Sequence, residues 1–217
     1  MQDERTGDQM SDEFETREKL LKCAMAEFSE NGYMKASLRK ICADAGVTTG
    51  ALYFFFKNKN DLFAAIVDPP LKGITKLLGE HYMHDAEEMA SDDPAVMSAE
   101  YHIETHGGLE MLVEYMYHYH DVIILLLTKA QGSEYENAVD MVVALTEKGF
   151  RMSAEKVVEK KPGCHIDEYM LHWIAHMSVD AYIHLLTHEN DVEKAKIHMK
   201  RIMEFLIKMW FSMIVDD

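Results

Sequence analysis

The chain has 217 residues, of which 48% are hydrophobic and 28% charged, and its formal net charge is −16. This composition supports a sizeable buried core and excludes a generally disordered chain. With 4 prolines and 11 glycines, a loop-rich all-β fold is disfavoured. The longest apolar run, Val122 to Leu127, is far shorter than the roughly 18 residues of a membrane helix, so no membrane partner is expected.

The polar, acidic start of the chain does not have the pattern of a secretory signal. Its three cysteines are an odd number without metal-ligand spacing. Both features favour a protein of the reducing cytoplasm.

Charge is distributed unevenly along the chain. Residues 1–15 hold one arginine against six acidic residues, whereas residues 16–60 hold eight lysines and arginines against four acidic residues. Residues 61–217 are acidic again, with 13 basic and 28 acidic residues. The total charge argues against nucleic acid, but a basic module fused to an acidic body indicates one polyanion-binding end. A chance fluctuation of composition is the alternative.

Apolar residues at helical spacing predict a first helix over residues 16–31. A short second helix is expected from Ser37 to about Ala45, because Ser37 is a good capping residue. Gly46 then supplies the left-handed residue of a tight turn.

The third helix is expected to begin after Thr48, with Leu52 and Phe56 as its buried positions. Asn58 can cap a fourth helix. Asp68-Pro69-Pro70 is expected to kink or stop that helix, because proline lacks the N–H that a helix interior needs.

The rest of the chain is also expected to be helical, with no strand and no internal repeat. Gly107-Gly108 and Lys161-Pro162-Gly163 are the predicted interruptions. The expected helices cover residues 71–84, a stretch from Pro94, and residues 109–120, 121–130, 134–160, 165–188 and 192–215.

Two short helices joined by a glycine-centred turn and preceded by a longer helix describe a helix-turn-helix. Small residues at the start of the third helix let its backbone approach a major groove closely. The same spacing also fits an ordinary αα-hairpin in a helical adaptor that binds proteins and not DNA.

The sequence of residues 14–66 resembles the DNA-binding domain of the TetR/AcrR family of bacterial transcriptional regulators. The resemblance rests on six short motifs distributed over the first four predicted helices. They are Ala26-Glu27-Phe28, Asn31-Gly32-Tyr33, Ser37-Leu38-Arg39-Lys40-Ile41, Ala45-Gly46-Val47, Gly50-Ala51-Leu52-Tyr53 and Phe56-Lys57-Asn58-Lys59.

The resemblance implies a homodimer that binds a near-palindromic DNA operator and is released from it by a small-molecule inducer. It implies no enzymatic activity and no cofactor. It also implies a set of DNA-contacting residues: Ser37, Arg39, Thr48, Thr49, Gly50, Ala51, Tyr53, Phe54, Lys57 and Lys59.

These residues match family positions with different roles. Ser37, Thr48 and Tyr53 match positions that bind phosphates, and Lys57 and Lys59 match positions near the DNA backbone. Arg39 matches a position that can reach a guanine edge, worth ~1–3 kcal/mol of discrimination.

The chain departs from the family at two aromatic positions. Phe54 and Phe55 stand where members often have histidine or another polar aromatic residue. Phenylalanine cannot donate to a phosphate, although it can contact a thymine methyl group. We therefore expect one of the two to be partly buried in the core.

Histidine recurs at i,i+4 spacing in the second half of the chain, where one face of the helix predicted over 165–188 carries a series. The series is His172, His176, Asp180, His184 and His188, and His102 and His106 form a further pair. Such pairs could bind zinc or nickel, which makes a metal-responsive regulator the alternative function. A polar face beside a dimer interface is the simpler interpretation, and we predict no metal site.

Residues 102–106 do not form a zinc-protease motif, because Glu104 is two residues after His102 and not one. Methionine is frequent, with 17 residues. Its flexible side chain suits a permissive ligand cavity, but it also fills gaps in helical cores. No ligand-binding residue can be named from the sequence.

The sequence therefore predicts an all-α protein of about nine helices with three segments. Residues 1–13 are expected to be a flexible N-terminus, and residues 14–60 a three-helix DNA-binding domain with a helix-turn-helix. Residues 61–217 are expected to form the larger ligand-sensing and dimerisation domain. The two amphipathic helices predicted over 165–188 and 192–215 would pair across the two-fold axis.

Overall fold

The computed structural model describes residues 3–105 and 109–216, and this part of the chain contains ten α-helices, one 3₁₀ helix and a two-stranded sheet. The prediction of an all-α fold is confirmed. The chain divides into two compact units: Met1–Leu71 with Asp121–Asn137, and Lys72–His120 with Ala138–Asp217. In the described part of the chain, no helix has the length and apolarity that a membrane crossing requires.

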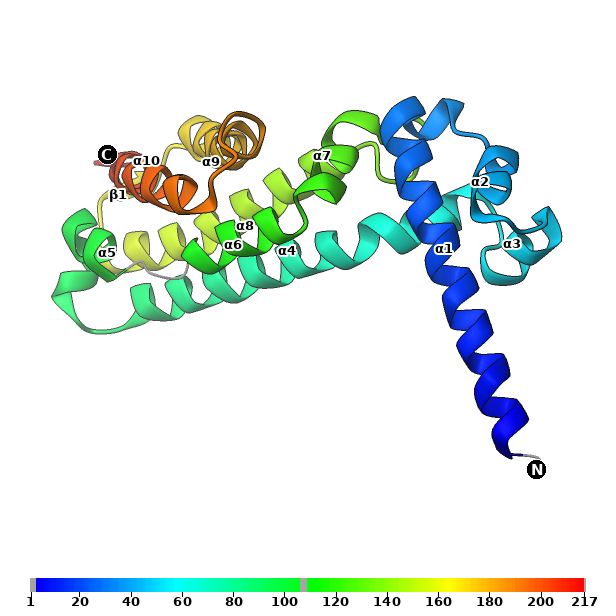
Figure 1. The fold of residues 1–217 in the computed structure, drawn as a ribbon. Coiled ribbons are helices and arrows are strands. Elements are labelled where there is room, and N and C mark those ends of the chain that lie inside the picture. The colour runs from blue at the N-terminus through cyan, green and yellow to red at the C-terminus, as the bar shows by residue number, and fades with distance from the viewer. Residues whose placement is uncertain (1–2, 106–108, 217) are drawn as a thin grey trace. The chain divides into compact units, whose positions relative to one another are not determined.

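The first unit is built on three N-terminal helices (Figure 1): α1 (Asp3–Lys35), α2 (Leu38–Ala45) and α3 (Thr49–Phe55). The first part of α4 (Lys59–Ala90) and most of α7 (His120–Lys129) complete it. Phe28 and Phe63 meet edge to face with centroids 4.9 Å apart, an arrangement that aromatic pairs favour. The fully buried side chains of this unit include Leu20, Phe28, Ile41, Leu52, Leu62 and Phe63.

Helix α1 begins at Asp3, 13 residues before the predicted start at Thr16. The residues expected as a flexible N-terminus are therefore helical from Asp3 onward. Acidic residues at a helix start interact favourably with the helix dipole, and the start of this chain is rich in them. At the other end, Gly32 departs from helical geometry, with a φ of 72°.

Helix α4 continues through Pro69 and Pro70, so of the two predicted outcomes, a kink or a stop, the stop does not occur. A proline in a helix interior costs about 3 kcal/mol. The buried residues Phe63 and Val67 precede the prolines at helical spacing, and Leu71 and the residues after it continue the same buried stripe. Packing along the whole stripe offsets the cost of the two prolines.

Helix α8 (Ala138–Lys160) begins four residues after the predicted start at Glu134. Ser133 caps a turn and not a helix, because its hydroxyl donates to Ala130 O (2.6 Å) and accepts from Tyr135 N (3.0 Å). The carboxylate of Glu136 accepts from Gly132 N (3.0 Å). In this segment, these local hydrogen bonds take the place of the backbone hydrogen bonds of a helix.

The second unit contains the later helices of the chain, and α9 packs against both α8 and α10 (Figure 1). One of its core clusters includes Leu171, Ile174, Trp210 and Met213. The predicted interruption at Gly107-Gly108 lies outside the described residues. The remaining elements of the unit are η1 (Pro94–Met97), α5 (Ala99–Thr105), α6 (Leu109–His118), α9 (Glu168–His188) and α10 (Val192–Ser212).

Two short strands, β1 (Cys164–Ile166) and β2 (Ile214–Asp216), pair antiparallel in this unit, so the prediction of no strand is wrong. His165 lies opposite Val215 in the pair. Three residues are too short a segment to show a strand period, and the pairing joins segments far apart in the chain. The helix predicted over 165–188 consequently begins later, at Glu168, and the helix predicted over 192–215 ends earlier, at Ser212.

Candidate nucleic-acid interface and ligand cavities

The turn between α2 and α3 has the tight geometry of a helix-turn-helix. Gly46 has a φ of 69° and a ψ of 28°, a left-handed conformation that glycine adopts without strain. Its backbone N–H bonds back to the end of α2, and Val47 N donates to Cys42 O at 2.9 Å. The predicted turn and both flanking helices are confirmed.

Two hydroxyls predicted to bind phosphates also cap the short helices. Ser37 Oγ accepts from Lys40 N at 3.4 Å, and Thr48 Oγ1 accepts from Ala51 N at 3.2 Å. A capping hydroxyl uses a lone pair and keeps its own O–H as a donor. Ser37 and Thr48 can therefore cap a helix and bind a phosphate at the same time.

Most of the predicted DNA-contacting residues share the exposed surface of α2, α3 and the residues around them. Leu52 is fully buried and Phe56 is 3% exposed, and these two anchor α3 from its inner side as predicted. The exposed predicted residues are Ser37, Arg39, Thr48, Thr49, Gly50, Tyr53, Phe54 and Lys57, whereas Ala51 and Lys59 are half-buried.

The two departures from the family pattern have different environments. Phe54 is 70% exposed, whereas Phe55 is half-buried. The two rings meet edge to face with centroids 5.0 Å apart. As expected, one phenylalanine of the pair belongs partly to the core, and it is Phe55. Phe54 is the one available for an apolar contact with a base.

Glu27 of α1 holds the start of α2 in place, a role that sequence reasoning missed. Its Oε1 accepts from Ser37 N (2.9 Å) and its Oε2 lies 2.8 Å from Lys40 Nζ. Glu27 is 3% exposed, and the hydrogen bond from Lys40 keeps the pKa of this carboxyl below its usual value. The sequence does carry a signal for the burial of Glu27, because the helical period of α1 places this residue between the buried Ala24 and Phe28.

Lys59 has an internal contact that the resemblance did not imply. Its Nζ donates to Met34 O (3.0 Å) and lies 4.9 Å from the centre of the Tyr33 ring. Burial lowers the pKa of Lys59. The side chain therefore ties α4 to the end of α1, whereas Lys57 is exposed.

An open groove of about 330 Å³ runs between α1 and α3. Asp12, Glu13 and Thr16 line one side, and Phe54 and Phe55 belong to the other. Two carboxylates therefore lie beside the predicted DNA-reading helix. Sequence reasoning missed this contact because it expected residues 1–13 to be a flexible tip.

The segment 131–137 is attached to α4 within the first unit. Tyr135 OH donates to Asp68 Oδ1 (3.0 Å), and Glu134 N donates to Asn60 Oδ1 (3.2 Å). Burial, helped by Asp68, raises the pKa of Tyr135 to about 12. A segment from the second half of the sequence thus becomes part of the N-terminal unit.

The histidine series on α9 forms contacts in pairs. His172 Nδ1 lies 2.8 Å from Glu147 Oε2, and its ring meets that of His176 at 4.6 Å. The rings of His184 and His188 stack 4.1 Å apart. Within the described residues, no group of three or more His, Cys, Asp or Glu side chains is suited to hold a metal ion. His106, the partner of His102 in the further pair, lies outside the described residues.

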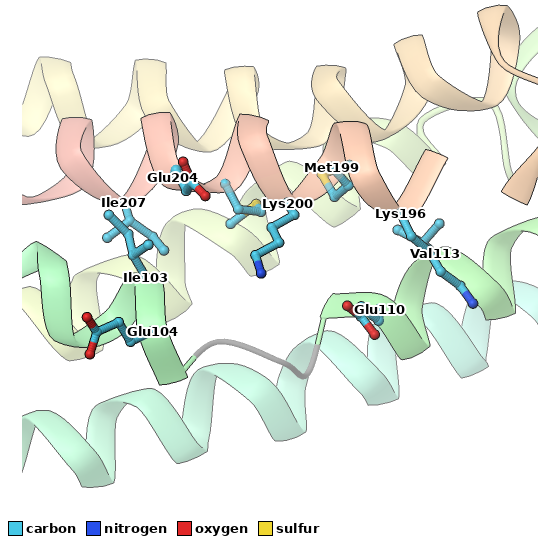
Figure 2. Close-up of a pocket in the computed structure, with 10 residues that line it drawn as sticks. Ile103, Glu104, Glu110, Val113, Lys196, Met199, Lys200, Glu204 and Ile207 are labelled. Carbon is cyan, nitrogen blue, oxygen red and sulfur yellow. The ribbon is translucent and has the colours of Figure 1, made fainter. Parts of the chain in front are cut away.

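A crevice of about 130 Å³ lies between α10 and the α5–α6 region. Figure 2 shows Lys200 pointing from α10 into the space between Glu104 and Glu110. Val113 and Met199 contribute apolar lining. The rim is thus charged and of mixed sign.

A second cavity, of about 60 Å³ and partly open, is lined by residues of α4, α5, α8 and α10. Its lining is mainly apolar and aromatic and includes Phe150, Trp210 and Phe211. The polar side chains on its wall include His81, Asp85 and His102. Both cavities lie within the second unit.

Comparison with known proteins identifies the N-terminal helices. Residues 20–66 match the family model "Bacterial regulatory proteins, tetR family". The HTH-type transcriptional regulator AcrR of Shigella flexneri is 48% identical over 52 residues, which cover 24% of this chain and 24% of that protein. The sequence similarity thus spans about a quarter of the relative's length.

Solved structures extend the likeness to the whole fold. A transcriptional regulator from Aquifex aeolicus VF5 aligns with a TM-score of 0.54 and 20% identity, over 88% of this chain and 99% of that one. NalD of Pseudomonas aeruginosa, the secondary repressor of a multidrug efflux pump, aligns with a TM-score of 0.52 and 22% identity, over 95% and 99% of the two chains. The match to the tetR family model thus covers the helix-turn-helix and the helices beside it, and the solved structures share the surrounding fold.

Proposed function

We propose that this chain is a ligand-responsive transcriptional repressor that binds a near-palindromic operator as a homodimer in the bacterial cytoplasm. Regulators of the TetR family are ligand-responsive DNA-binding repressors. The observation that carries the proposal is the exposed surface of α3. Thr49, Tyr53 and Phe54 face outward, while Leu52 and Phe56 anchor the helix from within.

Residues 14–60 would bind DNA in this scheme. Ser37, Thr48 and Tyr53 would bind phosphates, and Lys57 would lie near the backbone. Arg39 and the exposed start of α3 would face the bases. The acidic remainder of the chain would repel DNA, so binding through the basic module should depend steeply on salt.

Residues 61–217 would sense the ligand and form the dimer. Both of the last two long helices expose large apolar residues. On α9 these are Tyr169 (76% exposed) and Trp173 (44%), and on α10 they are Ile197 (56%) and Phe205 (57%). Exposed apolar surface of this kind favours an interface between copies. Pairing of α9 and α10 across a two-fold axis would bury it.

Ligand binding would shift the dimer toward a state whose recognition helices no longer match successive major grooves, ~34 Å apart. The ligand can shift this equilibrium only by its differential affinity for the two states. We propose that α4 and the segment 131–137 carry the signal. Helix α4 takes part in both units, and Asp68 on α4 holds Tyr135 directly before the two prolines.

A gel-shift experiment with the DNA upstream of the chain's own gene tests this function. The proposal predicts a shifted band that competitor duplex of scrambled sequence does not remove. A chain that folds and dimerises but shifts no duplex would be the helical adaptor and not a regulator. Complex formation that required added zinc or nickel would support a metal-responsive regulator instead.

A further inference from the structure

The first histidine pair of α9 meets a carboxylate of α8. His172 and His176 are about one helical turn apart, so both imidazoles lie on one side of α9, and their ring centroids are 4.6 Å apart. His172 Nδ1 lies 2.8 Å from Glu147 Oε2. The side chain of His172 is 57% exposed and that of Glu147 is 29% exposed. Two imidazoles and a carboxylate from two helices thus come together at the surface of the second unit.

The carboxylate of Glu147 determines which nitrogen of His172 is available. An ionised carboxylate can only accept a hydrogen bond, so Nδ1 of His172 carries the hydrogen. In the neutral imidazole, the other nitrogen, Nε2, then keeps its lone pair. A histidine that binds a metal ion almost always donates its other ring N–H to a carboxylate, a backbone carbonyl or water, which orients the ring and makes it more basic. His172 therefore has the arrangement of a metal ligand.

Glu147 is itself held in position by Arg151. Its second oxygen, Oε1, lies 3.7 Å from Arg151 Nη2. Arg151 also makes a two-point contact with Glu168, at 2.7 and 2.6 Å. Two carboxylates around one guanidinium leave a net negative charge beside the histidines, and this charge favours a cation.

The second histidine pair of α9 has different support. His188 Nδ1 lies 2.9 Å from the carbonyl oxygen of His184 and 2.8 Å from Thr187 Oγ1. These partners are neutral groups of the same helix. A hydrogen bond to a carboxylate is stronger than one to a neutral acceptor, so Glu147 should increase the basicity of His172 more than these partners increase that of His188. Of the two pairs, His172 and His176 are the better arranged for a metal ion.

We infer that His172 and His176 bind one divalent transition-metal ion, such as zinc, nickel or copper, and that Glu147 is a positioning residue for His172. Imidazole nitrogen suits these ions, whereas magnesium and calcium prefer oxygen ligands. The two histidines supply two ligands, and water supplies the others. The sequence could not show the contact with Glu147, and without it we predicted no metal site. The site does not rest on the proposed function, because neither DNA nor a second copy of the chain takes part in it.

The experiment uses the full chain without an affinity tag and follows its tryptophan fluorescence while nickel chloride is added. Trp173 directly follows His172 and is 44% exposed, whereas Trp210, the other of the two tryptophans, is 7% exposed. Bound nickel should quench the fluorescence of Trp173 in a saturable way, and Trp173→Phe should lose that response. Magnesium chloride should neither quench the fluorescence nor displace the nickel.

Two pairs of variants test the residues of the site. His176→Gln should abolish the saturable quenching, whereas His188→Gln, in the second histidine pair, should leave it unchanged. Glu147→Ala should weaken nickel binding about 10–100-fold, the range for loss of a group that orients a metal ligand. Glu155→Ala removes an exposed acid of the same helix, changes the net charge equally and is the matched control. Thermal unfolding checks that each variant folds, and His172→Gln replaces His176→Gln if the latter does not.

Each of four results would overturn the inference: quenching that does not saturate, unchanged nickel affinity in folded His176→Gln, equal nickel affinities of Glu147→Ala and Glu155→Ala, or displacement of nickel by an equal concentration of magnesium. The last result would mean that the acidic chain attracts any divalent cation. The gel-shift experiment gives a separate answer. A chain that binds nickel at this site but shifts no duplex would contradict the proposed function and leave the metal site standing.

Discussion

Glu27 of α1 and Lys40 of α2 form an ion pair with Oε2 and Nζ 2.8 Å apart, in which the glutamate is buried and the lysine side chain is 48% exposed. The same carboxylate accepts from the backbone N–H of Ser37, directly before α2. One side chain of the first helix thus fixes both the start and the first turn of the second. Because the residues of the predicted DNA surface begin at Ser37, this contact sets where α2 presents them.

Glu27→Gln should destabilise the protein by about 1.5–3 kcal/mol, the range for a hydrogen bond to a charged group. The pKa of Glu27 is lowered in the folded state. Its contribution to stability is therefore present above the unfolded pKa and is lost as the pH falls through the folded pKa. Urea unfolding at neutral and acidic pH measures both effects. A difference between native and variant proteins that stayed constant down to acid pH would contradict the account.

Arg39→Ala should lower the preference for the best operator over single-base variants, with a loss of about 1–3 kcal/mol at one position. Lys57→Ala is the matched control. It should weaken binding to all duplexes alike and reduce the salt slope by about one. Fluorescence anisotropy with a set of operator variants measures both. If Arg39→Ala weakened every duplex equally, its predicted role at a base edge would be wrong.

Lys59→Ala should behave differently from Lys57→Ala, because Lys59 Nζ bonds to Met34 O and lies over the Tyr33 ring. Loss of this contact should reduce the stability by about 0.5–2 kcal/mol. Denaturant unfolding of the two variants provides the comparison. If the two variants were equally stable and only Lys59→Ala bound DNA more weakly, this account would be wrong. Lys59 would then have the role near the DNA backbone that the resemblance implies.

The double variant Asp12→Asn/Glu13→Gln should bind DNA more tightly than the native chain, since these carboxylates line the groove beside Phe54 and would repel phosphates. The gain should shrink as salt rises. Asp140→Asn/Glu155→Gln, two exposed acids on α8, changes the net charge equally and is the control. Equal gains in both variants would mean that total charge, and not the groove, controls affinity.

Gly73→Ala should destabilise the second unit, whereas Gly79→Ala on the same helix should not. A Cβ at Gly73 would collide with the ring and hydroxyl of Tyr115, and a Cβ at Gly79 meets nothing within 4 Å. Overpacking of this kind costs typically 1–3 kcal/mol, while alanine at an open helical site adds up to about 1 kcal/mol of stability. Thermal unfolding of the pair measures the contrast, and equal melting temperatures would contradict the packing described.

Local chemistry made much of the first unit predictable from the sequence. Ser37, Gly46, Thr48 and Asn58 all lie where a helix begins or ends, because capping and left-handed geometry depend on single residue types. Leu52 and Phe56 were buried as expected, since the helical period identifies the inner face.

Tertiary contacts decided the features that the sequence did not reveal. The burial stripe around Pro69 and Pro70 outweighs the local preference to end the helix. The strand Cys164–Ile166 exists only because Ile214–Asp216 pairs with it from far along the chain. Likewise, nothing in the sequence around Lys59 indicates that its side chain contacts Met34 and not the solvent.

The most direct test of the proposed function is selection of a duplex from a random pool by the purified chain, followed by an anisotropy titration of the selected duplex and a scrambled one at stepped salt concentrations. The account predicts that the selected duplexes share an inverted-repeat sequence and that at least two chains bind each duplex. It also predicts that the chain binds the selected duplex more tightly than the scrambled one at every salt concentration. Recovery of no common sequence, with equal affinity for both duplexes, would contradict it.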